Sequence, residues 1–264
     1  MQTFVLERGR APLLVSLPHD GSWIPDALSE RMSLGAREAP DTDWHVGRLY
    51  AVARAFDASI IRPFASRYVV DLNRAATGGV LYPGQRETSV VPLTTFADEP
   101  IYRAGAAPDA NEIAQRVVQW WQPYHHALGE ELARLRAIHP RVVLWDGHSI
   151  RSEVPMLFDG RLPDFSLGTA DGTSCAPQLQ TRLAAALDAQ TGYSHAVNGR
   201  FKGGWITRHY GIPADGIHAV QLELAQRSYM DEHSLAWDES LAGSVQRVIG
   251  ALLACCVGFA ERAA

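Results

Sequence analysis

The sequence predicts an α/β domain in which helices cover both faces of a sheet. Short apolar runs rich in leucine and β-branched residues alternate with longer stretches at helical spacing. A chain of 264 residues can bury one substantial core, so we expect a single domain over residues 1–264. Hydrophobic residues make up 47% of the chain and charged residues 20%, as in ordinary globular proteins.

The expected strands are apolar runs that end at turn or polar residues. They lie at residues 12–17, 58–62, 68–71, 141–146 and 218–224. In the last run, Val220, Leu222 and Leu224 alternate with Gln221 and Glu223, which is the period of a strand.

The expected helices occupy the stretches between the strands, at residues 43–56, 111–138, 178–190 and 239–260. The first follows Asp41 or Thr42 as an N-cap, and Pro123 should kink the second. In that second helix His125 has no HExxH spacing, so we expect it to be structural or solvent-facing. We expect Trp120 and Trp121 to lie in the core or on a helix-packing surface. Loops at 76–108, 159–177 and 198–216 are long enough to favour a functional role.

Composition restricts the partners and the compartment. The net charge is −5 with no run of Lys or Arg, which argues against nucleic acid. The three cysteines form no CxxC pattern, which fits a reducing compartment. The apolar run at 13–17 is too short for a signal peptide, and no stretch approaches the ~20 apolar residues of a membrane span. We therefore expect a cytoplasmic protein without a membrane partner, and the sequence fixes no oligomeric state.

Two histidines follow the ends of predicted strands. His19 comes directly after residues 12–17, and His148 follows residues 141–146. Ligand sites of open α/β sheets form at the carboxyl ends of strands, so both imidazoles can meet there. A third ligand is available from Asp41, Asp43 or His45. Two histidines and a carboxylate, with a position left for water, are typical of catalytic zinc, although Fe, Mn or Co would also fit. Hydrogen-bonded, half-buried histidines are the alternative.

Glu223 is a carboxylate late in a buried strand, where it is costly unless paired or bound. It would act as a general base toward an activated water, or else form a salt bridge with a residue such as Arg227.

The segment RYVVDLNR at 67–74 is the most polar strand end. Arg74 suits bidentate capture of a carboxylate, with Asn73 adding a donor. Arg67 would polarise a scissile carbonyl or stabilise an oxyanion. A surface ladder of Arg67, Asp71 and Arg74 is the alternative.

Taken together, these motifs resemble the N-formylglutamate amidohydrolase family. The matching segments are PHDGSWIP at 18–25, DTDWHVGRLY at 41–50, RYVVDLNR at 67–74, WDGHS at 145–149, NGRFKGGWITRHYG at 198–211 and QLELAQRSYMDE at 221–232. The resemblance implies a three-layer α/β/α sandwich with a mixed central sheet, phosphorylase/hydrolase-like and distantly similar to zinc carboxypeptidases and aspartoacylase. The distant relatives carry their acidic ligand three residues after the first histidine, where this chain has Ser22.

The resemblance also implies roles for single residues. It implies zinc on His19, on His148 and on an acidic residue of the 41–43 stretch, for which we select Asp43. It implies Glu223 as the general base and an Asn-Arg pair, here Asn73 and Arg74, that holds the substrate's carboxylate. The loop at 198–211 would add contacts from Lys202, Thr207 and Arg208.

The activity implied is metal-dependent hydrolysis of N-formyl-L-glutamate to formate and L-glutamate, the last step of a histidine degradation pathway. The partner is then a small acyl-amino acid. A deacylase for another N-acyl amino acid, acetyl or formimino, is the nearest alternative. A non-catalytic, metal-stabilised binding protein is a more distant one, because structural zinc is normally closed by four protein ligands.

Overall fold

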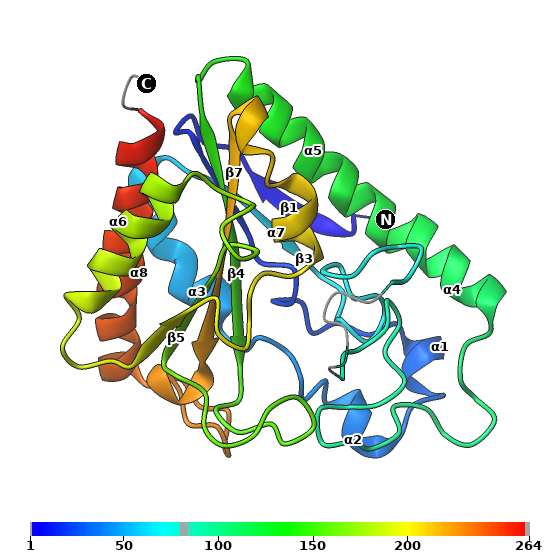
Figure 1. Cartoon of the computed structure of the whole chain (residues 1–264). Coiled ribbons are helices and arrows are strands. Elements are labelled where there is room, and N and C mark those ends of the chain that lie inside the picture. The colour runs from blue at the N-terminus through cyan, green and yellow to red at the C-terminus, as the bar shows by residue number, and fades with distance from the viewer. Residues whose placement is uncertain (1, 80–83, 85, 262–264) are drawn as a thin grey trace.

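The computed structural model, which describes residues 2–79, 84 and 86–261, contains one seven-stranded sheet with helices on both faces (Figure 1). The strand order is β1-β3-β2-β4-β7-β5-β6. β1 is antiparallel to β3 and β5 is antiparallel to β7, whereas the other neighbouring pairs are parallel, so the predicted mixed sheet is confirmed. The strands are β1 (Phe4–Glu7), β2 (Leu13–Ser16), β3 (Ser59–Pro63), β4 (Val142–Ile150), β5 (Phe165–Gly168), β6 (His195–Val197) and β7 (Ile217–Ala225).

Helices form the two outer layers. α3, α6 and α8 lie on one side of the sheet, and α5 and α7 lie on the other (Figure 1). The α-helices are α1 (Asp26–Ser29), α2 (Leu34–Arg37), α3 (Val46–Leu49), α4 (Ala110–Arg116), α5 (Gln122–Arg136), α6 (Pro177–Asp188), α7 (Trp205–Tyr210) and α8 (Glu239–Ala260). The 3₁₀ helices are η1 (Tyr50–Phe56), η3 (Pro213–Asp215) and η4 (Gln226–Ser228), and η2 (Val117–Trp121) is a π-helix.

The alternation of side chains along β4 decides where its polar residues lie. Val143 and Trp145 belong to the core on the α8 side, whereas Leu144 belongs to the core on the α5 side. By the two-residue period of a strand, Asp146 and His148 share the α5 side. On β7, Val220 and Leu222 pack toward α8 and Ala219 toward α5. Gln221 and Glu223 therefore share the face that carries His148.

Several sequence predictions are corrected by the fold. Three strands were not expected, namely β1, β5 and β6, and β5 lies inside the loop expected at 159–177. β4 continues to Ile150, so His148 lies inside the strand rather than after it, because β4 and β7 pair in register along their whole length. Residues 68–71 form turns rather than a strand. The helix expected at 43–56 begins at Val46, and its N-cap is His45 at φ 63° rather than Asp41 or Thr42.

The helix expected at 111–138 is interrupted differently from the prediction. Instead of a kink at Pro123, the π-helical stretch η2 joins α4 to α5, and Pro123 lies in the first turn of α5. Proline is tolerated there because the first N–H groups of a helix have no partner within it. In Figure 1 α4 and α5 follow one another along nearly one line.

α8 corrects one expectation about apolar stretches. By length and composition it is apolar enough to cross a membrane, with a mean hydropathy of 1.6 over an 18-residue stretch. In the fold it is a core helix, since Val245, Ile249 and Leu252 are fully buried against the sheet and η1.

Candidate metal centre and active site

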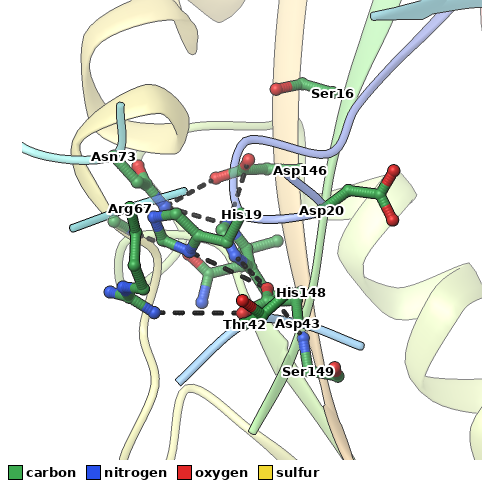
Figure 2. A network of polar contacts seen from close by, with 12 residues as sticks. Ser16, His19, Asp20, Thr42, Asp43, Arg67, Asn73, Asp146, His148 and Ser149 are labelled. Atoms are coloured by element: carbon green, nitrogen blue, oxygen red, sulfur yellow. Dashed lines mark hydrogen bonds and ion pairs between the residues drawn. The ribbon is translucent and has the colours of Figure 1, made fainter. Parts of the chain in front are cut away.

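His19 follows β2 and is held by a buried carboxylate. Its Nε2 lies 2.7 Å from Oδ1 of Asp71, and because a carboxylate only accepts, Nε2 carries the proton. Its Nδ1 faces Asp43, 3.8 Å from Oδ2 (Figure 2). Burial, and then the neighbouring Arg67, lowers the pKa of His19, which keeps the ring neutral. A neutral imidazole with Nδ1 presented to a carboxylate is a ready metal ligand.

His148 approaches the same carboxylate from β4. Its Nδ1 lies 3.1 Å from Oδ2 of Asp43. Its Nε2 lies 2.9 Å from Nδ2 of Asn73 and 3.1 Å from Oδ1 of Asp146. Both histidines therefore direct Nδ1 to Asp43, while other side chains surround Nε2 (Figure 2).

Asp43 is placed between the histidines by its own backbone and by β4. Its N–H donates to the carbonyl of His19 over 3.1 Å, and the N–H of Ser149 donates to its Oδ2 over 3.1 Å. The alternatives from the sequence have other partners. Asp41 accepts from the hydroxyl of Tyr68 at 2.6 Å, and Nε2 of His45 lies 2.9 Å from the carbonyl of Leu235.

The donor set fits a divalent metal. The ligand atoms of His19, Asp43 and His148 all lie within 4.8 Å of one another, and all three residues are buried. Ligand atoms of a tetrahedral zinc with bonds of about 2.0–2.1 Å are about 3.3 Å apart, close to the 3.1 and 3.8 Å found here. Asp43, Asp71 and Asp146 are buried around the ligand atoms together with one arginine, Arg67, so carboxylates outnumber arginines there. A divalent cation would offset that cost.

Glu223 is the carboxylate beside this group. It is the register partner of His148 on the neighbouring parallel strand, and it lines the same cavity as His19 and His148. Burial raises its pKa to about 8, although His148 acts in the opposite direction. The alternative salt bridge is not formed, because Arg227 instead pairs with Asp164 at 2.9 Å. A buried carboxyl with a raised pKa at a cavity wall is suited to proton transfer.

Arg67 and Asp71 form a buried ion pair, not the surface ladder considered from the sequence. Nη2 of Arg67 donates to Oδ2 of Asp71 over 2.7 Å, and its Nη1 lies 3.9 Å from Oδ1 of Asp43. Burial would raise the pKa of Asp71, but His19 and Arg67 outweigh it and hold that pKa well below its usual value. The ionised Asp71 thus orients the candidate metal ligand His19 and the cation Arg67 together.

Asn73 braces the site through both ends of its amide. Its Nδ2 faces His148 and Asp146, and its Oδ1 accepts from the N–H of Ile206 in α7 at 2.8 Å. A β-carbon on Gly204 would lie 2.4 Å from Nδ2 of Asn73, so only glycine permits this approach. The structure therefore gives Asn73 a role in ordering His148, in addition to any contact with substrate.

One cavity opens onto these residues. Arg74 lines it, with its Nε donating to the carbonyl of Thr88 over 2.9 Å. Arg200 lines it from the loop after β6, with its Nε donating to the carbonyl of Leu157 over 2.7 Å. The wall consists of His19, Asp43, Arg67, Asn73, Arg74, Arg86, Glu87, Thr88, Phe96, His148, Ser149, Ile150, Leu157, Arg200, Phe201, Gly204, Gln221 and Glu223.

The cavity draws on loops that the sequence marked as functional. Arg86 to Thr88 and Phe96 come from the loop expected at 76–108, of which residues 80–83 and 85 lie outside the described part. Arg200, Phe201 and Gly204 come from the loop expected at 198–216. Sequence reasoning missed Arg200, although it lies in the NGRFKGGW segment that carries the resemblance.

The other three residues expected from that loop do not line this cavity. Thr207 is fully buried and donates to Oδ2 of Asp146 over 3.2 Å. Lys202 pairs with Asp171 at 3.1 Å, and Nε of Arg208 donates to the carbonyl of Gly203 over 2.9 Å. Thr207 thus stabilises the group around His148, whereas Lys202 and Arg208 contact other parts of the surface.

The fold and the site define a class of protein: an α/β protein with a buried His-Asp-His group, suited to a divalent metal, beside a carboxylate in a cavity lined by arginines. Residues 11–230 match the family model described as N-formylglutamate amidohydrolase. The chain belongs to the N-formylglutamate amidohydrolase family.

Similar proteins agree with this membership. The chain is 51% identical over 248 residues to an N-formylglutamate deformylase of Pseudomonas aeruginosa, covering 94% of this chain and 93% of that protein. It is 50% identical over 247 residues to an N-formylglutamate deformylase of Pseudomonas putida, covering 93% and 92%. A crystal structure of N-formylglutamate amidohydrolase from Ralstonia eutropha matches with a TM-score of 0.85 at 23% identity, over 99% of each chain. That match supports the fold.

Proposed function

We propose that this protein hydrolyses N-formyl-L-glutamate to formate and L-glutamate with a zinc ion held by His19, Asp43 and His148. The observation that carries the proposal is the buried His-Asp-His group opening, together with Glu223, into a cavity lined by arginines. The 51% identity to a deformylase of P. aeruginosa supports the substrate. Zinc is chosen over other divalent metals because two imidazoles and one carboxylate, with a place left for water, form its usual catalytic donor set.

A metal in such a site polarises an acyl oxygen and acidifies a water, so that the water can attack the formyl carbon. Glu223 then accepts the proton of the attacking water and returns it to the leaving nitrogen of glutamate. Its raised pKa suits both halves of this transfer, because the group must first bind the proton and then release it.

Arg67 supports the charge that develops on the formyl oxygen. It lines the cavity, and its ion pair with Asp71 fixes the guanidinium before substrate arrives. A fixed cation of this kind stabilises an oxyanion without reorganising during the reaction.

The two carboxylates of the substrate require cations, which a chain of net charge −5 must supply locally. Arg74 and Arg200 line the same cavity, and each is anchored through Nε to a backbone carbonyl. We assign one carboxylate to Arg74, as the resemblance implies, and the other to Arg200 in place of Arg208.

The substrate assignment is tested by comparing acyl-amino acids. Release of the free amino acid is measured with N-formyl-L-glutamate, N-formyl-L-aspartate, N-acetyl-L-glutamate and N-formimino-L-glutamate. The proposal expects the highest kcat/KM for N-formyl-L-glutamate, and a higher value for the acetyl or formimino compound would contradict it.

A further inference from the structure

Residues 72–74 carry Asn73 and Arg74 to the cavity without a helix or strand of their own. Side chains from the helices on the α5 side hold this segment instead. The carbonyl of Leu72 lies 2.8 Å from Nε2 of His125, and the carbonyl of Arg74 accepts from Nε1 of Trp121 over 2.9 Å. The segment is therefore bound on both sides of Asn73 by ring N–H groups.

These rings form one packed aromatic cluster. The centroids of Trp121 and His125 are 3.9 Å apart, and Trp205 lies 4.7 Å from His125 and 5.0 Å from Trp121. A carbonyl only accepts, so Nε2 of His125 carries the proton, and Nδ1 faces the hydroxyl of Tyr210 at 3.1 Å. Burial lowers the pKa of His125 to about 3, which keeps the ring in this neutral form.

The π-helical stretch η2 places the two donors. Trp121 is its last residue, and His125 follows four residues later on the same face of α5. Single π-helical turns are rare and occur mostly at functional sites. Here the irregularity brings two ring N–H groups to the segment that presents Arg74. The sequence predicted no functional role for either ring, and neither lines the cavity itself.

We propose that Trp121 and His125 are positioning residues, which fix the backbone of residues 72–74 so that Arg74 meets the substrate carboxylate in one orientation. The inference rests on the proposed function, because Arg74 is taken to bind that carboxylate. Without a donor, a buried carbonyl is left unsatisfied, so the segment shifts to find another partner. Asn73 keeps its own contacts with Asp146 and Ile206, so the loss appears mainly in substrate binding rather than in the proton transfer at Glu223.

The test removes one donor at a time. Trp121→Phe loses the indole N–H, and His125→Phe loses the imidazole N–H, while both keep a ring in the cluster. Each variant should raise KM for N-formyl-L-glutamate by about tenfold, with kcat changed less than about threefold. His125→Gln restores a donor and should return KM toward the wild-type value. Trp120→Phe is the matched control, because Trp120 packs against Trp23 instead, and its KM should not change.

A double-mutant cycle separates an effect that acts through Arg74 from a general loss of structural stability. In an Arg74→Ala background, Trp121→Phe should add little to the KM, whereas independent effects would multiply. Wild-type hydrolysis combined with an unchanged KM in both ring variants, or with multiplying effects, would overturn the inference and leave the proposed function intact. A lack of wild-type hydrolysis at full metal occupancy would overturn the proposed function and the inference with it.

Discussion

His148 on β4 and Glu223 on β7 are register partners in two parallel strands, so a candidate metal ligand and the candidate base lie side by side on one face of the sheet. The pairing of β4 with β7 holds His148 and Glu223 next to each other, so no loop has to move to bring them together. A site built on neighbouring strands holds its groups more precisely than one built on loops.

Replacing Glu223 by Gln should lower kcat by about 10²–10⁴-fold, the usual contribution of a positioned general base. The amide keeps the shape of the side chain but cannot accept the proton. Metal content should stay at the wild-type level, because Glu223 is not one of the metal ligands assigned here. Glu130→Gln, at an exposed position on α5, is the control. Near-normal turnover of the Glu223 variant would remove the base assignment.

Replacing Asp71 by Asn should weaken metal binding by about 10–100-fold, as expected when the carboxylate behind a metal-bound histidine is lost. One carboxylate oxygen of Asp71 accepts from His19 and the other accepts from Arg67. The amide of asparagine has only one oxygen, so it cannot accept both hydrogen bonds in this way. Metal affinity is measured by competition with a chelator. Asp57→Asn, whose carboxylate pairs with Arg10 near the surface, provides the baseline. Equal affinities for the two variants would speak against the orienting role.

Replacing Arg200 by Ala should reduce kcat/KM for N-formyl-L-glutamate by about thirtyfold or more, because a lost charge-assisted contact costs about 2 kcal/mol or more. Arg208→Ala is the matched comparison, since Arg208 lies close in sequence, on α7, but does not line the cavity. Steady-state kinetics of both variants show whether Arg200 or Arg208 binds a substrate carboxylate. A larger loss for Arg208→Ala would favour the original sequence prediction over the assignment of Arg200.

The buried His125 should make stability depend on pH. The unfolded chain protonates this imidazole below about pH 6.5, whereas the folded protein does so only near pH 3. Between these values the unfolded state binds more protons, so stability falls as the pH falls, by up to about 1.4 kcal/mol per pH unit. His125→Gln should reduce this slope, while His19 and His218, whose pKa values burial also lowers, keep contributing to it. Urea unfolding at several pH values from 4.5 to 7.5 measures it, and identical slopes for wild type and variant would contradict the assignment.

The sequence predicted most of the sheet because buried strands leave continuous apolar runs. It missed β1, β5 and β6, and it failed at residues 68–71, where the run YVVD is buried but forms turns. There Nη1 of Arg116 donates to the carbonyls of Tyr68 and Val69, which need no strand partner. A run of apolar residues indicates that a segment is buried. Whether it forms a turn or a strand depends on its hydrogen bonds, and here these come from a residue far along the chain.

The candidate site was predictable where residue type decides the chemistry, as for His19 and His148. The resemblance implied only an acidic residue of the 41–43 stretch. Both acids lie in one polar stretch, and only the fold directs Asp41 to Tyr68. The cavity roles of Arg200 and Arg208 could not be separated for a similar reason. Both lie in the segment 198–211, and the path of that segment depends on contacts such as the one between Arg200 and the carbonyl of Leu157.

Metal reconstitution of the stripped protein tests the central claim most directly. Formate and glutamate released from N-formyl-L-glutamate are measured while zinc is added to protein freed of metal by a chelator. Activity should rise linearly and saturate at about one zinc per chain, and an Asp43→Ala variant should need far more zinc. Full activity without bound metal, or one tightly bound zinc per chain without any hydrolysis, would contradict the account.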